Sequence, residues 1–186
     1  TARSTRRVLA CLRKLAAERP VFVKDTLEYR YQFLFDHPQE LADIRHTFIV
    51  RHPAPTISSH YAMKPTVTCR EIGYEHQYEL YSLVREVADE PPVVISAERL
   101  LADPQRVVAA YCAAVGLPFL PHALSWEAQD RPEWRRTREW HTTAAASTGF
   151  TAVPQRYEVT VDNDERLRAF YDYHLPFYER LVRHAL

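Results

Sequence analysis

Apolar residues recur every three or four positions along much of this chain, a spacing that predicts amphipathic helices. In the first such segment Val8, Leu12 and Leu15 fall on one helical face, and the pattern stops before Pro20. Helices of this kind are predicted over Arg6–Glu18, Leu27–Leu34, Pro38–Ile44, Tyr74–Val87 and Asp164–Leu186, the last one broken by Pro176.

One further helix carries signals at both of its ends. Asp103 can cap its first turn, Pro104 suits the first helical position, and Gly116 is a typical C-terminal stop. We therefore predict a helix over residues 104–115.

Short apolar runs separate these helices and are rich in β-favouring residues. They are Val21–Lys24, Thr47–Val50 and Val93–Ile95, and each is typical of a short buried strand. Strands that alternate with helical connections predict a parallel sheet with right-handed crossovers. We expect an α/β fold in a single domain, residues 1–186.

Composition excludes several classes of protein. The 186 residues are 46% hydrophobic and 26% charged, as in ordinary globular domains. Basic and acidic residues number 24 each, so no net charge favours a nucleic-acid partner. No apolar run predicts a membrane span or a signal-peptide core, and the histidines form no compact ligand set that predicts a metal site.

Cys11, Cys69 and Cys112 form no CxxC pair and are expected to be small buried thiols of a cytoplasmic protein. The sequence is compatible with a homo-oligomer.

The junction after the strand Thr47–Val50 is the first candidate site. Arg51 lies at the carboxyl end of this strand, where ligands bind in open α/β sheets, and Pro55 suits the start of a following helix. Ser59 then lies about one turn into that helix, where its hydroxyl and the Arg51 guanidinium can contact one phosphate. A surface arginine and a helix-capping serine would give the same residues.

Three blocks of the chain resemble the sulfotransferases that use 3′-phosphoadenosine 5′-phosphosulfate, in their bacterial small-molecule branch. Arg51, Pro53, Ser59 and Tyr61 match the spacing of the family's 3′-phosphate motif. The segments Val93–Pro104 and Val115–Pro118 look like its strand, E-x-L-x-x-D-P turn, helix and hydrophobic-G-L-P exit. Val21–Asp25 is similar to the central strand whose end carries a catalytic lysine and base.

The resemblance implies a three-layer α/β/α fold with a central parallel sheet, similar to that of P-loop hydrolases. It also implies transfer of a sulfuryl group to a small-molecule hydroxyl or amine, with adenosine 3′,5′-bisphosphate as product and no metal. Lys24 would supply positive charge to the leaving group. Many relatives have a histidine base two residues after that lysine, whereas this chain has Thr26, so Glu28 and Asp25 are the local candidates. If the family resemblance is set aside, Lys24 and Asp25 are simply solvent-exposed residues at the end of a predicted strand.

A late segment rich in tryptophan and arginine lies where the family returns a loop to its cofactor. Trp134 and Trp140 can stack on adenine, and Arg135 and Arg136 can contact the 3′-phosphate. A solvated helical face with half-buried tryptophans would give the same residues. His141 is a further acid or base candidate.

The chain departs from the family pattern at its start. Family members begin with a strand and a basic loop that holds the 5′-phosphosulfate, and neither precedes Arg6. The chain has three glycines and no glycine-rich loop. We expect the N-terminal strand and loop of the family to be missing from this sequence. The alternative is a catalytically inactive relative that binds a nucleotide or a protein. A nucleotide kinase fits less well, because no Gly-Lys-Ser/Thr is present.

Overall fold

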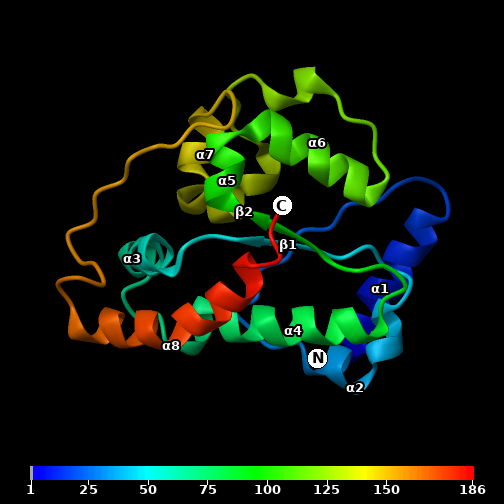
Figure 1. Cartoon of the computed structure of the whole chain (residues 1–186), viewed down its shortest axis with the longest axis horizontal. Helices are drawn as coiled ribbons and strands as arrows, with labels where there is room; N and C mark the ends of the chain where they lie inside the picture. The colour runs from blue at the N-terminus through cyan, green and yellow to red at the C-terminus, as the bar shows by residue number, and fades with distance from the viewer. Residues whose placement is uncertain (1) are drawn as a thin grey trace. The chain divides into compact units, whose positions relative to one another are not determined.

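The computed structural model describes residues 2–186 and shows a mostly helical α/β chain with two short strands (Figure 1). Its helices and strands are α1 (Ala2–Ala16), α2 (Gln32–Asp36), β1 (Thr47–Val50), α3 (Pro53–Met63), α4 (Tyr74–Val87), β2 (Val93–Ser96), α5 (Ala97–Ala102), α6 (Pro104–Val115), α7 (Thr142–Ala146) and α8 (Glu165–Val182). Short 3₁₀ helices cover Pro38–Leu41, Arg70–Ile72, Pro121–Leu124 and Pro132–Trp140.

The chain forms two compact units. The first consists of residues 1–48 and 68–92, and the second of residues 49–67 and 93–186. In the first unit the start of β1 and the segment before it pack against helix α4 and the residues that follow it. Phe48 meets Tyr81 edge-to-face at 5.6 Å between ring centroids, and the Asp89 N–H donates to the Ala42 carbonyl at 3.1 Å.

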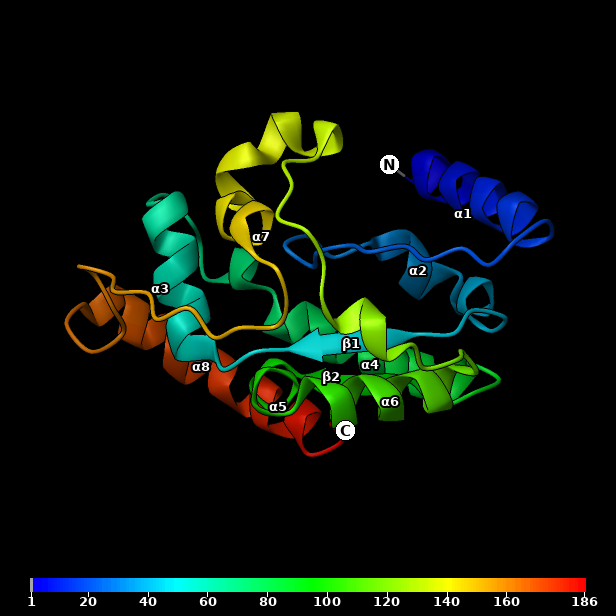
Figure 2. The ribbon, with the colours of Figure 1, turned by 90° about the horizontal axis from the view of Figure 1, so that it is seen from above.

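The second unit contains the end of β1, Ile49 and Val50, and all of β2. β1 and β2 lie side by side and parallel in a two-stranded sheet (Figure 2). The C-terminal tail extends the pairing, because Val94 forms a parallel bridge with Ala185 and its carbonyl accepts from the Leu186 N–H at 3.0 Å. α8 packs against α3 and β2 and buries Leu167 and Leu181 completely. This packing fixes the start of α3, where the candidate site lies.

The predicted ends of α6 are confirmed. The Asp103 side chain accepts from the Arg106 N–H at 3.1 Å, Pro104 is the first helical residue, and Gly116 has φ 73°. A left-handed residue at that position ends a helix, and glycine adopts this conformation without steric cost. The bounds predicted for Thr47–Val50 and Tyr74–Val87 also agree with the structure.

The strand predicted at Val21–Lys24 is wrong. These residues are irregular, and the Phe22 and Val23 side chains are 77% and 54% exposed. A strand needs a neighbour to accept and donate its backbone hydrogen bonds. Across residues 2–186 the sheet contains only β1 and β2, so no strand pairs with this run. The central sheet of a three-layer fold is likewise not seen in the described chain.

Three further expectations need correction. Pro176 does not break the last helix, because α8 continues through it from Glu165 to Val182. The predicted helix at Leu27–Leu34 is the short α2, which starts later. Cys11 is exposed rather than buried, and the Cys69 and Cys112 side chains are partly buried.

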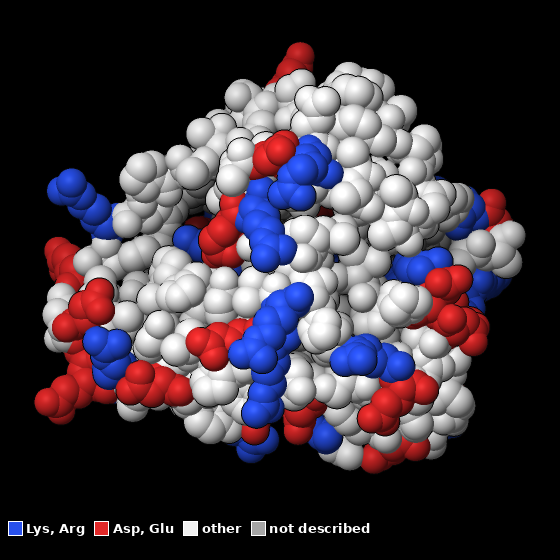
Figure 3. Space-filling model, viewed as in Figure 1, with Lys and Arg blue, Asp and Glu red and all other residues white. Residues whose placement is uncertain are grey.

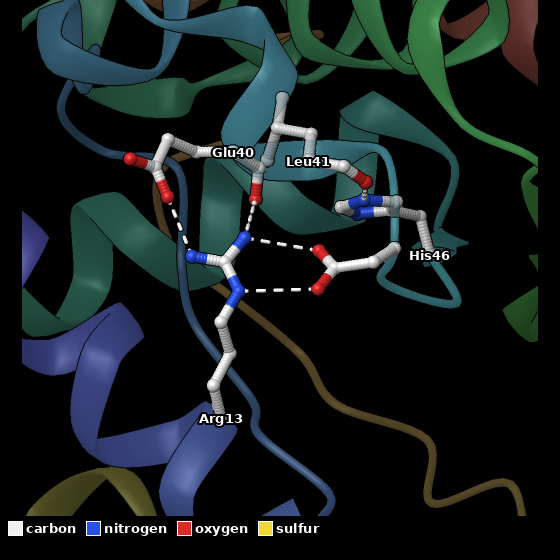
Figure 4. A network of polar contacts seen from close by, with 5 residues as sticks. Arg13, Glu40, Leu41 and His46 are labelled. Carbon is white, nitrogen blue, oxygen red and sulfur yellow. Dashed lines mark hydrogen bonds and ion pairs between the residues drawn. The ribbon is translucent and has the colours of Figure 1, made fainter.

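A polar network in the first unit fixes the loop before β1 (Figure 4). The Arg13 guanidinium donates to the Glu40 carboxylate at 2.5 Å and to both Asp43 carboxylate oxygens at 2.9 and 3.1 Å. Nearby, His46 Nε2 donates to the Leu41 carbonyl at 2.9 Å. Burial lowers the pKa of His46, although the Leu41 carbonyl and Asp43 oppose this shift.

Acidic and basic side chains lie next to one another on the face drawn in Figure 3. Within residues 2–186, no helix combines the length and apolar character that crossing a membrane requires.

Candidate functional site

The strand-to-helix junction of the second unit is built as the sequence predicted. β1 ends at Val50, and Arg51 follows as an exposed residue at its carboxyl end. His52 then precedes the first helical residue, Pro53. A guanidinium at the end of a parallel strand and beside the start of a helix is suited to an anion.

The start of α3 offers few backbone donors. The helix begins at Pro53, two residues before the predicted start at Pro55, so two of its first three residues lack an N–H. Of these three residues only Ala54 has a backbone N–H to donate. An anion at this junction would therefore depend mainly on side chains.

Ser59 lies further along α3 than predicted. It is six residues after Pro53, which places it roughly 9 Å along the helix axis at 1.5 Å per residue. The long Arg51 side chain can reach along the first turns of the helix. Arg51 and Ser59 can therefore contact the same phosphate only if that phosphate lies along the side of α3 and not at its N-terminal end.

Glu98 ties the turn after β1 to the turn after β2. Its Oε1 accepts from the His52 backbone N–H at 2.7 Å, and its Oε2 accepts from the Ser96 hydroxyl at 2.8 Å. Burial alone would raise the pKa of Glu98, but these hydrogen bonds, its own backbone N–H and the nearby His52 hold this pKa below its usual value. A charged carboxylate thus holds together two neighbouring strand ends.

The His52 ring packs between two tyrosines of α8. Its centroid lies 5.9 Å from that of Tyr171 and 5.4 Å from that of Tyr178. Burial raises the pKa of Tyr178, and the negative charge of Glu98 adds to this shift. The turn that carries Arg51 is therefore held in two ways. Glu98 bonds the backbone N–H of His52, and the His52 ring packs against α8.

The tryptophan segment meets α3. Trp140 lies edge-on to His60, with ring centroids 5.6 Å apart, and His60 is the neighbour of Ser59. Trp134 stacks instead on His141 at 4.8 Å and an interplanar angle of 15°. One face of the Trp134 ring is thus covered by His141.

His141 has a structural role in this segment. It precedes α7, and its Nδ1 donates to the Thr137 carbonyl at 2.7 Å. Arg135 and Arg136 are exposed on the 3₁₀ helix that carries both tryptophans. Trp140, Arg135 and Arg136 thus share one short segment, which meets α3 where Trp140 contacts His60.

The catalytic candidates of the first unit lie on an irregular segment. Lys24 and Asp25 are exposed, whereas Glu28 is partly buried. Burial raises the pKa of Tyr31, and a hydrogen bond to Asp25 and the charges of Asp25 and Glu28 add to this shift. The two carboxylates therefore lie close to one phenol.

Helix α4 holds this irregular segment in place. His76 Nδ1 donates to the Leu27 carbonyl at 3.1 Å, and Gly73 lies so close that a Cβ there would come within 2.7 Å of the same oxygen. Sequence reasoning missed Glu98, His52, Gly73 and His76 as parts of a site. Of these four, only the burial of His76 could be expected from the sequence. His76 is four residues before Leu80, which places it on the predicted apolar face of α4.

Within residues 2–186, no group of three or more histidine, cysteine or acidic side chains is placed to hold a metal ion.

The chain is similar to two curated proteins of Arabidopsis thaliana. They are branched-chain-amino-acid aminotransferase-like proteins 2 and 1, each 29% identical over 165 residues. Each match covers 80% of this chain and 29% of the relative, so the chain spans less than a third of their length. No solved structure matches. A family model described as a sulfotransferase domain matches residues 7–185, almost the whole chain. The chain therefore belongs to the sulfotransferase domain family.

Proposed function

We propose that this chain transfers a sulfuryl group from 3′-phosphoadenosine 5′-phosphosulfate to a hydroxyl or amine of a small molecule. The family match supports a sulfotransferase. The observation that carries the donor assignment is Arg51 at the end of β1, directly before α3, on a turn that Glu98 holds at 2.7 Å.

The second unit fits the nucleotide end of this donor. A guanidinium, a hydroxyl and an exposed indole suit a 3′-phosphate and an adenine, and Arg51, Ser59 and Trp140 supply them. Arg135 and Arg136 add positive charge beside Trp140, and Trp134 supports the segment through its stack on His141. The bound donor would supply the sulfuryl group, and adenosine 3′,5′-bisphosphate would be released.

The acceptor must lose a proton as the new bond to sulfur forms. We propose Glu28 as the group that takes this proton, ahead of Asp25 and His141. Asp25 already accepts from the Thr26 N–H at 2.7 Å and bonds Tyr31, and His141 uses Nδ1 to bond Thr137. Lys24 would place positive charge near the leaving group. The acceptor is proposed to be a small molecule in the cytoplasm.

One observation favours a second candidate function. The segment that should carry Lys24 at a strand end is irregular, and Lys24 is exposed on it. A domain that only binds the nucleotide would not need Lys24 to be fixed at a strand end. The aminotransferase-like names belong to relatives of which this chain matches 29%, and no aminotransferase activity is proposed.

Calorimetry with adenosine 3′,5′-bisphosphate tests the proposal, with adenosine 5′-monophosphate as the matched ligand that lacks the 3′-phosphate. We expect saturable binding of the bisphosphate only. Transfer is then measured from the phosphosulfate donor to a panel of phenols and amines. Binding with transfer supports the enzyme, binding without any transfer supports the non-catalytic domain, and equal affinity for the two nucleotides would contradict both.

A further inference from the structure

The first turn of α5 connects three segments of the second unit. Ser96 is the last residue of β2 and caps α5, because its hydroxyl oxygen accepts from the Arg99 N–H at 3.3 Å. Glu98 and Arg99 are consecutive residues that bond different segments. Glu98 accepts from the His52 N–H in the turn after β1, whereas the Arg99 guanidinium donates to the C-terminal tail. One turn of helix thus ties two strand ends to the tail.

The tail itself is paired with β2 (Figure 1). Val94 forms a parallel bridge with Ala185, and its carbonyl accepts from the Leu186 N–H at 3.0 Å. Arg99 Nη1 donates to the Ala185 carbonyl at 2.6 Å and to that of Leu186 at 3.3 Å. Arg99 therefore fixes α5 to a segment that is already bound to the strand before it.

The Tyr178 side chain of α8 lies close to both charged residues of this turn. Burial raises the pKa of Tyr178, the negative charge of Glu98 adds to this shift, and the positive charge of Arg99 opposes it. The same ring contacts the His52 ring at 5.4 Å between centroids. These four residues therefore share one corner of the second unit.

The position of α5 depends on contacts of this kind. The helix has six residues, and none of them is buried. A helix this short is not stable by itself in water, so packing and hydrogen bonds to other segments must hold it. The two bonds of Arg99 start one residue after Glu98. Their loss would allow the first turn of α5 to move, and with it the carboxylate that accepts from His52.

We infer that Arg99 is a positioning residue for the nucleotide site, which acts through Glu98 on the turn that carries Arg51. The inference rests on the proposed function, since Arg51 is the proposed ligand of the 3′-phosphate. Arg99 is exposed, so water competes for its bonds to the tail. Its removal should therefore have a smaller effect than the removal of Glu98.

Hydrogen exchange at the His52 amide reports on this corner without any nucleotide. It is measured by NMR on the full chain labelled with ¹⁵N. We expect exchange about two- to fourfold faster in Arg99→Ala than in the parent. The double variant Glu98→Ala/Arg99→Ala should exchange no faster than Glu98→Ala, because Arg99 acts through Glu98. Unchanged exchange in Arg99→Ala, or a double variant that adds the full effects of both substitutions, would overturn the inference.

Arg166 provides a matched control. Its guanidinium also donates to two backbone carbonyls of the second unit, those of Pro65 and Val67. Arg166→Ala should leave exchange at His52 at the parent rate. Arg99→Lys keeps a positive charge and a donor, and should restore part of the protection. If Arg166→Ala and Arg99→Ala accelerate exchange at His52 equally, the cause is a general loss of stability and Arg99 has no positioning role.

Calorimetry connects this corner to the nucleotide. Arg99→Ala should bind adenosine 3′,5′-bisphosphate about two- to fourfold more weakly than the parent, and the same substitution should have no further effect in Arg51→Ala. Unchanged affinity in Arg99→Ala, or an equal loss in both backgrounds, counts against the inference. If the parent does not bind the bisphosphate, the proposed function fails, whereas exchange at His52 still decides whether Arg99 holds the turn.

Discussion

The backbone N–H of His52 donates to Oε1 of Glu98 at 2.7 Å, although 46 residues separate them in sequence. The contact joins the turn after β1 to the first turn of α5, which follows β2. Because Arg51 directly precedes His52, the Glu98 carboxylate also restrains the backbone that carries the Arg51 guanidinium.

Replacing Glu98 with alanine should weaken bisphosphate binding about three- to tenfold, because the turn that carries Arg51 loses a hydrogen bond of roughly 1 kcal/mol. Glu98→Gln keeps an acceptor for the His52 N–H and should fall between alanine and the parent. Calorimetry measures both, with Glu165→Ala on the exposed first turn of α8 as control. Unchanged affinity in Glu98→Ala would show that the turn holds its shape without this carboxylate.

Arg51→Ala should lower bisphosphate affinity by tens to thousands of fold, since a phosphate left without its charged partner loses on the order of 2–5 kcal/mol. Ser59→Ala removes a neutral hydroxyl and should cost about tenfold or less. Arg106→Ala, which removes another exposed arginine of the same unit, serves as control. If Arg51→Ala and Arg106→Ala bind equally well, the junction after β1 is not the 3′-phosphate site.

Glu28→Gln keeps the shape of the side chain and removes the proposed base, so turnover should fall roughly 10²–10⁴-fold with bisphosphate affinity nearly intact. Lys24→Ala should also act on turnover more than on binding. Steady-state kinetics and calorimetry on each variant separate the two effects. Full turnover in Glu28→Gln would move the base to Asp25 or His141, and equal losses of binding and turnover in Lys24→Ala would make Lys24 a binding residue.

His46 should make the protein less stable in mild acid. Burial lowers its pKa in the folded state, so below about pH 6.5 the unfolded chain binds more protons, and the free energy of unfolding falls as the pH falls. His46→Gln keeps a donor for the Leu41 carbonyl and cannot titrate. The decrease in melting temperature from pH 7.5 to 5.5 should therefore be smaller in this variant than in the parent, while the exposed His122→Gln control follows the parent. Identical pH profiles for His46→Gln and the parent would contradict the assignment.

Gly73→Ala should destabilise the protein by roughly 1–3 kcal/mol, because residue 73 has φ 87° and its new Cβ would lie 2.7 Å from the Leu27 carbonyl oxygen. Gly116 is the matched control, since it also has a positive φ (73°) but a methyl group added there would meet no atom within 4 Å. Gly116→Ala should therefore lose only the conformational part, about 1 kcal/mol. Denaturant unfolding measures both, and equal losses would mean that the contact with Leu27 relaxes freely.

Local sequence determined the elements whose signals lie within a few residues. The cap at Asp103 and the stop at Gly116 fix α6, and the apolar runs at Thr47–Val50 and Val93–Ile95 form the two strands. The same local pattern located Arg51 at a strand end. Hydrogen bonds within a helix and side-chain caps need only neighbours in sequence, which is why these predictions succeeded.

Tertiary structure decided whatever depended on a distant partner. Val21–Lys24 has the residues of a strand, but within residues 2–186 no strand pairs with it, and the Phe22 and Val23 side chains stay exposed. Glu98 gained its role from a backbone N–H 46 residues away, and His76 from a carbonyl 49 residues away. A single sequence carries no record of such pairings, because each partner is an ordinary residue until packing brings the two together.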